Sequence, residues 1–285
     1  CLQWERYAAC FADVGETRRI TFAPGYRGAR ILGAHAEGPF LNVKKCGAQN
    51  PDYILAPDFA RMEPLLANVR LMTVAPEGEG ACELIRQLRA AGVTASIGHT
   101  GADYAQTMAG IEAGATHVTH TFNAMPSLLH RQPGAVGALL NDPRVFCELI
   151  ADGFHVHPTL IAMAARLKGD KLVLITDSIR FSGLPDGQYT LGGQTVTVHG
   201  IECRLPDGTI AGSTLTMDRA VRNAVALGGL SAAQAAKAAT ASAAACIGET
   251  ERGTLRPGAQ ADVAVFDEHL QPLATLVGGV EVWRA

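Results

Sequence analysis

The chain has 285 residues, 48% of them hydrophobic and 18% charged, which is the composition of a folded globular protein with ample material for a core. Its 24 basic and 27 acidic side chains give a formal net charge of −3, so no overall positive field exists to attract nucleic acid or an anionic membrane. The apolar runs are far shorter than the roughly 18 to 20 residues of a membrane span. Composition therefore favours a soluble, enzyme-sized protein that binds neither nucleic acid nor membrane.

Short apolar runs alternate with segments of helical periodicity over the first two thirds of the chain. The runs expected as strands cover residues 30–36, 69–75, 93–97, 115–119, 145–151 and 171–176. Between them, apolar residues recur at helical spacing, as in residues 82–88 and 160–167. This alternation predicts βαβ units around a parallel sheet. Six such units can be counted, whereas a closed (β/α)₈ barrel needs eight.

After Asp177 the pattern changes to short strands around Gly-Gly turns, then helices, then strands again. The expected strands cover residues 187–198, 201–205, 262–266, 273–277 and 280–283, and the expected helices cover 215–227 and 231–246. We therefore expect a barrel body over residues 1–186 that continues in helices within 213–250. A small β subdomain is expected to combine residues 187–212 and 251–285.

The seven cysteines are scattered, odd in number and contain no Cys-x-x-Cys pair. This usage is typical of small buried thiols in a reducing compartment rather than of disulfides or metal ligands. The first residues show neither a charged leader nor a long apolar segment. A cytoplasmic protein is therefore expected.

Histidines and carboxylates stand at or just after five of the expected strand ends. They are His35, Glu37, His99, His117, His120, Asp152, His155, His157 and Asp177. Because the carboxyl ends of parallel strands meet at one edge of the sheet, these side chains are expected to converge there. Such groups are costly to bury unpaired, so packing alone does not account for them.

Two imidazoles and a carboxylate suit a divalent metal with one position open for water. Such a cation acidifies bound water and polarises a carbonyl, and a nearby carboxylate must then move the proton. Asp177, after the last barrel strand, is the natural candidate for that proton transfer. Spacing alone leaves open which three side chains bind the metal. The candidates are Glu37, His99, His117, His120, His155 and His157.

Several ordered motifs carry a family resemblance over about residues 30–285. They are His35-x-Glu37-Gly38-Pro39-Phe40-Leu41, Gly98-His99-Thr100, Thr119-His120-Thr121-Phe122-Asn123-Ala124-Met125-Pro126, Ala151-Asp152-Gly153-x-His155-Val156 and Thr176-Asp177. This set resembles the N-acetylglucosamine-6-phosphate deacetylases of the amidohydrolase superfamily. The resemblance implies a TIM-like (β/α) barrel of the metal-dependent hydrolase type, with a small β subdomain towards the C-terminal end. It also implies hydrolysis of the acetamide of N-acetylglucosamine 6-phosphate, in amino-sugar catabolism.

The resemblance assigns the metal ligands and the proton-transfer group. It implies that Glu37, His99 and His120 hold a divalent metal and that Asp177 acts as general base and acid. Zinc is the expected metal, although iron, cobalt and manganese accept the same ligands. His117, three residues before His120, is interpreted as structural. An additional metal pair formed by His155 and His157, two residues apart on an extended segment, is an alternative.

The resemblance also implies a set of substrate contacts. Asn123 and Ala124 match the loop that receives the sugar phosphate, and His155 matches a residue that contacts the substrate. Arg131 matches an arginine that reaches the phosphate across a homodimer interface, a role that suits a planar guanidinium. Leu215, Thr216 and Met217 match the wall beside the acetyl group. Gln49 stands where the family has a histidine, and an amide cannot act as an imidazole ligand.

The resemblance also predicts that the barrel is incomplete. The family has two barrel strands before the strand that bears the glutamate, and the sequence shows no counterpart of them. We therefore expect exposed sheet edges between the first and last strands. The chain is interpreted as a fragment or an incomplete gene product, and completion by a partner chain or an altered start is the alternative.

Two other functions compete with deacetylation. A cyclic-amide hydrolase of the same superfamily usually needs a carbamylated lysine on a strand, and Lys171, the lysine on an expected strand, stands at its beginning, the wrong end. The other alternative is a truncated barrel that binds metal or sugar phosphate without catalysis. The missing strands and Gln49 favour that alternative, and the retention of the metal ligands and Asp177 opposes it.

Overall fold

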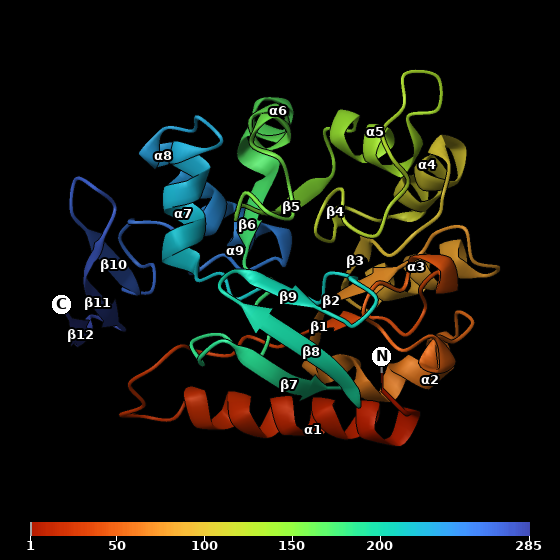
Figure 1. Ribbon diagram of the computed structural model, residues 1–285. Coiled ribbons are helices and arrows are strands. Elements are labelled where there is room, and N and C mark those ends of the chain that lie inside the picture. Colours follow the sequence, from red (N-terminus) through yellow and green to blue (C-terminus); the bar gives the residue numbers. More distant parts are fainter. Residues whose placement is uncertain (1) are drawn as a thin grey trace.

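The computed structural model describes residues 2–285 and places six parallel strands in one sheet, paired in chain order. The strands are β1 (Ala34–Glu37), β2 (Val69–Val74), β3 (Thr94–Ile97), β4 (His117–Val118), β5 (Phe146–Ile150) and β6 (Leu172–Ile175). The sheet curls into a half-barrel (Figure 1). The prediction of an incomplete TIM-like barrel with six βα units is therefore confirmed. No strand pairing joins β1 to β6 within the described residues, which leaves the two expected edges.

Helices cover the outer face of the curled sheet and bury its apolar side chains (Figure 1). They are α3 (Ala81–Ala90), α4 (Tyr104–Ala113), α5 (Gly134–Asn141) and α6 (Pro158–Lys168). In α3, for example, Leu84, Ile85 and Leu88 repeat at helical spacing and are at most 2% exposed. Because both faces of the strands are covered, β2 and β5 are almost continuously buried, as is typical of parallel sheets.

One helix lies where no element was predicted. Helix α1 (Trp4–Thr21) carries only Tyr7, Phe11 and Thr21 as buried residues, so its apolar periodicity is weak. Tyr7 and Phe11 join the main core, and the Tyr7 hydroxyl donates a hydrogen bond to the carbonyl of Gly38. Short helical segments lie between β1 and β2, namely α2 (Phe59–Met62) and 3₁₀ turns at Val43–Lys45, Pro51–Tyr53 and Glu63–Asn68, and a further 3₁₀ turn, Gly169–Lys171, precedes β6. Tertiary burial, rather than the helix pattern, holds α1 in place.

The later strands form two separate antiparallel sheets of three strands each. One contains β7 (Gly187–Leu191), β8 (Gln194–His199) and β9 (Glu202–Arg204), and the other β10 (Val263–Phe266), β11 (Pro272–Val277) and β12 (Val280–Arg284). No strand pairing joins the two sheets in the described part of the chain, and Figure 1 shows them in different parts of the molecule. The grouping of residues 187–212 and 251–285 in one subdomain stays a prediction, although its strands are not one sheet.

Three helices lie between these two sheets in the sequence: α7 (Met217–Ala226), α8 (Ala232–Ala239) and α9 (Ala241–Cys246). The helix expected over 231–246 is divided at Thr240, whose backbone leaves the helical region at φ −129° and ψ −87°. A capping box of Ser231 and Gln234 begins α8, which agrees with the N-cap signal in the sequence. Among residues 2–285, no helix has both the length and the apolarity needed to cross a bilayer.

Candidate active site

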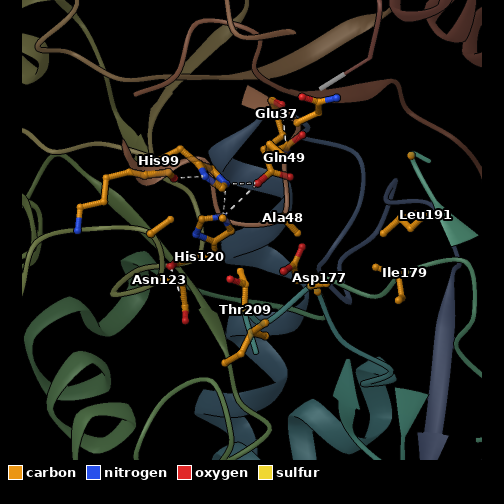
Figure 2. A pocket seen from close by; sticks show the side chains of 18 of the residues that line it. Glu37, Ala48, Gln49, His99, His120, Asn123, Asp177, Ile179, Leu191 and Thr209 are labelled. Carbon is orange, nitrogen blue, oxygen red and sulfur yellow. Dashed lines mark hydrogen bonds and ion pairs between the residues drawn. The ribbon is translucent and has the colours of Figure 1, made fainter. Parts of the chain in front are cut away.

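The carboxyl ends of β1, β3 and β4 bring together one carboxylate and two imidazoles. The Glu37 Oε1 atom lies 2.6 Å from His99 Nε2 and 3.1 Å from His120 Nε2, and the two Nε2 atoms lie 3.0 Å apart. Figure 2 shows both rings pointing at the Glu37 carboxylate. Within the described residues, these three side chains form the group of potential metal ligands whose donor atoms all lie within 4.8 Å of one another. The geometry therefore supports the predicted ligand set.

The backbone turns sharply out of the sheet at three of the predicted residues. His99, His120 and Asp177 have φ values of +46°, +30° and +50°. Residues other than glycine rarely adopt this left-handed backbone region. Each of these three residues stands two residues beyond the end of a strand. Strained backbone of this kind persists where surrounding contacts fix it, and it gathers at functional sites.

The hydrogen bond of His99 fits it for metal binding. Its Nδ1 atom lies 2.8 Å from the carbonyl oxygen of Lys45, and because a carbonyl only accepts, Nδ1 must carry the proton. The Nε2 atom, which lies 2.6 Å from Glu37 Oε1, is then the ring nitrogen that would bind a cation. Such a hydrogen bond on the remote ring nitrogen is the usual support of a metal-binding histidine. His120 lacks this support, because its buried Nδ1 has no hydrogen-bond partner among residues 2–285.

Charge coupling and burial shift the pKa values of Glu37, His120 and Asp177. Burial disfavours ionisation of Glu37, but hydrogen bonds from His120 and His99 outweigh it and hold the pKa of this carboxyl well below its usual range. Burial alone would lower the pKa of His120, yet the Glu37 carboxylate raises it to about 9. Burial, and then the nearby Glu37 charge, raise the pKa of Asp177 to about 6. Glu37 is thus an anion, which suits it to bind a cation. The pKa of Asp177 lies close to neutral pH, as a general base requires.

A cavity of about 590 Å³ opens over this cluster. Eight predicted site residues line it: Glu37, Gln49, His99, His120, Asn123, Ala124, His155 and Asp177. Figure 2 shows Asp177 and Gln49 from different segments around the same space as the two imidazoles. The fold therefore brings together residues that are 140 positions apart in the sequence, and the cavity is large enough for a monosaccharide phosphate.

Four predicted substrate residues do not line this cavity. Arg131 is exposed on the loop after β4. Leu215 is buried with Ile150 and Ala220, and Thr216 is exposed. Met217 lines a neighbouring cavity of about 340 Å³ that also touches Glu37, His120 and Asp177. The predicted roles of these four residues stay predictions.

His155 and His157 have different environments. The buried carboxylate of Asp152 lies 2.6 Å from His155 Nδ1, which assigns the proton to that nitrogen and orients Nε2 away from Asp152. His157 instead caps α6, because its Nδ1 accepts the backbone N–H of Thr159 at 3.2 Å. This capping contact provides an ordinary structural role for His157, and it does not favour the alternative metal pair.

The sequence analysis missed residues that reach the cavity from the first antiparallel sheet. The turn between β7 and β8 contributes Leu191, Gly192 and Gln194, and residues 209–212 contribute a second wall. Gln194 Nε2 donates a hydrogen bond of 2.9 Å to the carbonyl of Ala48, which ties this hairpin to the segment that carries Gln49. The sequence predicts the Gly-Gly turn of this hairpin, but a single sequence carries no signal that the hairpin reaches the cavity.

Comparison with known proteins agrees with this architecture. The sequence pattern of the amidohydrolase family matches residues 11–282. The chain is 41% identical over 251 residues to an N-acetylgalactosamine-6-phosphate deacetylase of Escherichia coli O157:H7, which covers 86% of this chain and 67% of that protein. It is 38% identical over 263 residues to an N-acetylglucosamine-6-phosphate deacetylase of Lysinibacillus sphaericus, which covers 90% of this chain and 68% of that protein. The chain thus spans about two thirds of the length of these relatives.

Solved structures extend the match to the fold. A mutant N-acetyl-D-glucosamine-6-phosphate deacetylase of Mycobacterium smegmatis, in complex with N-acetyl-D-glucosamine-6-phosphate, superposes with a TM-score of 0.92 at 37% identity. That match covers 99% of this chain and 74% of the other. The chain belongs to the amidohydrolase family, a family of metal-dependent hydrolases. Within that family, its relatives at this level of identity are deacetylases of N-acetylated hexosamine 6-phosphates.

Proposed function

We propose that the chain carries the catalytic site of an N-acetylglucosamine-6-phosphate deacetylase, which hydrolyses the acetamide to glucosamine 6-phosphate and acetate in amino-sugar catabolism. The single observation that supports this most strongly is the Glu37, His99 and His120 cluster beneath a cavity that Asp177 also lines. Such a cluster with an adjacent carboxylate is the arrangement that metal-assisted amide hydrolysis requires. A cytoplasmic location and a homodimer accompany the proposal.

The donor set fits a divalent metal, and zinc is the ion we propose. Glu37, His99 and His120 would hold it, because two imidazole nitrogens and one carboxylate oxygen match a catalytic zinc site with a position left open. Iron, cobalt and manganese accept the same set. When bound, the cation polarises the acetyl carbonyl and makes water more acidic.

Asp177 performs the proton transfers in this scheme. Its carboxylate accepts a proton from the water that attacks the acetyl carbon, and it returns the proton to the sugar nitrogen as the C–N bond breaks. Water and amide are thereby converted to acetate and amine, with no other reactant. His155, oriented by Asp152, would donate a hydrogen bond to the substrate or accept one from it. Asn123 and Ala124 would receive the phosphate, with Gln49 as a neutral contact on the cavity wall.

Two observations bear on the competing functions. Lys171 stands directly before β6 with its ammonium group 3.9 Å from the centre of the Phe146 ring, so it lies at the opposite strand end from the ligands. A carbamylated lysine at that position could not reach the metal cluster, which disfavours the cyclic-amide hydrolase. The presence of the Glu37, His99 and His120 cluster, together with a cavity that Asp177 also lines, disfavours a truncated barrel that binds metal or sugar phosphate without catalysis.

The proposal is tested with the purified, metal-loaded chain and a direct assay of acetate release. We expect turnover of N-acetylglucosamine 6-phosphate, slower turnover of the galactosamine epimer, and little turnover of unphosphorylated N-acetylglucosamine. A preference for the galactosamine epimer would instead indicate the activity for which the Escherichia coli relative is named, deacetylation of N-acetylgalactosamine 6-phosphate. Metal binding without release of acetate from any of the three would favour the non-catalytic alternative.

Arg131 is expected to act in the site of the partner chain. Replacing it with alanine should raise KM for the phosphorylated substrate about tenfold or more, because a charge-assisted hydrogen bond of about 1.5–3 kcal/mol is lost. Turnover of unphosphorylated substrate should change little. Steady-state kinetics with both substrates provides the measurement, and Arg27→Ala, at an exposed arginine before β1, is the matched control.

Co-expression of two variants tests whether the arginine crosses the interface. Consider a dimer of one Arg131→Ala chain and one Asp177→Asn chain. The site of the Arg131→Ala chain keeps its own Asp177 and receives an intact Arg131 from the Asp177→Asn chain, so this site is complete. Activity above that of either variant alone is therefore expected. An equal loss of binding for both substrates, or no gain on co-expression, would count against this role.

A further inference from the structure

A ring of polar side chains lies in the interior of the half-barrel, next to the predicted metal ligands Glu37 and His120. It consists of His35, Thr73, Ser96, His117, Thr119 and Glu148, contributed by β1 to β5 and the residue that follows β4. Four of its contacts are hydrogen bonds of 2.6–2.9 Å, namely His35 to Thr73, Thr73 to Thr119, Thr119 to Ser96, and Ser96 to His117. Glu148 Oε1 completes the ring at 3.5 Å from His117 Nε2 and 3.8 Å from His35 Nδ1.

Glu148 is the member of this ring that reaches a metal ligand. Its other carboxylate oxygen, Oε2, accepts the backbone N–H of His120 at 3.0 Å, and its own carbonyl accepts the N–H of Thr121 at 2.9 Å. The Glu148 side chain is only 6% exposed. Burying a carboxyl group to this extent is costly unless its oxygens find partners, and the His120 N–H is the hydrogen-bond donor that this side chain has.

Backbone hydrogen bonds to the sheet flank His120, at Thr119 and Thr121, but within the described residues His120 itself makes none to a strand backbone. Strand β4 is only two residues long, and its pairing with β5 ends at Val118 and Cys147. The chain then turns through His120 at φ +30°, a conformation that an L-residue avoids unless its surroundings impose it. His120 Nδ1 lacks a partner among the described residues, so no hydrogen bond to the remote ring nitrogen orients the ring as Lys45 does for His99. The orientation of His120 therefore depends on its backbone.

We propose that Glu148 is a positioning residue for the metal centre, which fixes His120 through a hydrogen bond from its backbone N–H to the carboxylate. On the other side, this carboxylate packs against the ring of polar side chains, with His117 Nε2 at 3.5 Å and His35 Nδ1 at 3.8 Å. The proposal rests on the proposed metal site, but it does not depend on the substrate. In other metal sites, loss of such outer-sphere support weakens metal binding about 10- to 100-fold.

Two substitutions separate the reach of the oxygen from the carboxyl group itself. Glu148→Gln replaces the carboxyl group by an amide but keeps an oxygen at the same reach, so its Co²⁺ affinity should stay within about threefold of the parent chain. Glu148→Asp keeps the carboxyl group but withdraws the oxygen from His120 by one methylene, so its affinity should fall about tenfold or more. Both are measured by titration of the metal-free protein with Co²⁺, followed by the visible absorption of the bound ion.

A stability control distinguishes positioning from general damage to β5. Leu149→Ala opens a cavity in the adjacent core and should lower Tm while leaving the Co²⁺ affinity and spectrum unchanged. Retention of full affinity by Glu148→Asp would overturn the proposal, as would a Gln variant as weak as the Asp variant. If the parent chain itself bound no Co²⁺, the metal site rather than this inference would have failed.

Discussion

Replacing Asp177 with asparagine is expected to lower kcat about 10²- to 10⁴-fold, the usual contribution of a general acid–base group. Asparagine has the same shape, and it tolerates the left-handed backbone that Asp177 adopts at φ +50°. The substitution should therefore leave the fold and the cavity intact. What it removes is the ability to accept a proton from water and return it to the leaving nitrogen. The measurement is acetate release at saturating substrate, together with Co²⁺ titration of the same preparations.

The metal titration decides how the loss of turnover is interpreted. Asp177 lies outside the three-atom cluster of Glu37, His99 and His120, so its neutral variant should keep metal affinity. Asp13→Asn is the matched control, because Asp13 is an exposed carboxylate on α1, well away from the cluster. Undiminished turnover in Asp177→Asn would remove the assigned role. A parallel loss of metal would instead make Asp177 a further ligand.

The fold and the metal cluster could be predicted because they depend on local patterns in the sequence. Parallel strands are buried on both faces, so runs such as residues 145–151 are apolar except for Glu148 and are easily recognised. The predicted site residues stand at or just beyond strand ends, and parallel pairing necessarily gathers those ends at one edge. Choosing Glu37, His99 and His120 from the candidates still required the family resemblance, since spacing does not reveal which side chains point inward.

Other features depend on tertiary contacts that no local pattern encodes. The hairpin residue Gln194 reaches the cavity through its hydrogen bond to Ala48, 146 positions away in the sequence. Helix α1 is held by two aromatic side chains that pack on a distant core. In the sequence, Glu148 is an isolated acid in an apolar strand, and the turn at His120 provides the hydrogen-bond donor to its side chain. In each case, the role of the residue depends on a contact with a residue that is distant in the sequence, so the local sequence does not reveal it.

Glu37→Gln is expected to weaken metal binding by more than about 100-fold, because loss of a ligand should exceed the 10- to 100-fold effect of its outer supports. The Glu37 carboxylate is the only anionic group in the three-residue cluster, and its Oε1 contacts both imidazoles. Glutamine keeps the volume but offers a neutral oxygen to the cation. Co²⁺ titration is the measurement, and Glu112→Gln, an exposed carboxylate paired with Arg144, should leave the affinity unchanged.

The same substitution should alter the pH dependence of metal binding. In the metal-free parent chain, Glu37 raises the pKa of His120 to about 9, so a proton occupies this ligand at pH 7 and the metal must displace it. Apparent affinity should therefore rise with pH until about pH 9, with a proton released on binding. Without the Glu37 charge, burial lowers the pKa of His120, and the rise should end at a lower pH. Calorimetry in buffers of different ionisation enthalpy measures the number of protons released when the metal binds. Equal release by the parent chain and the variant near pH 7 would show that Glu37 does not control the protonation of His120.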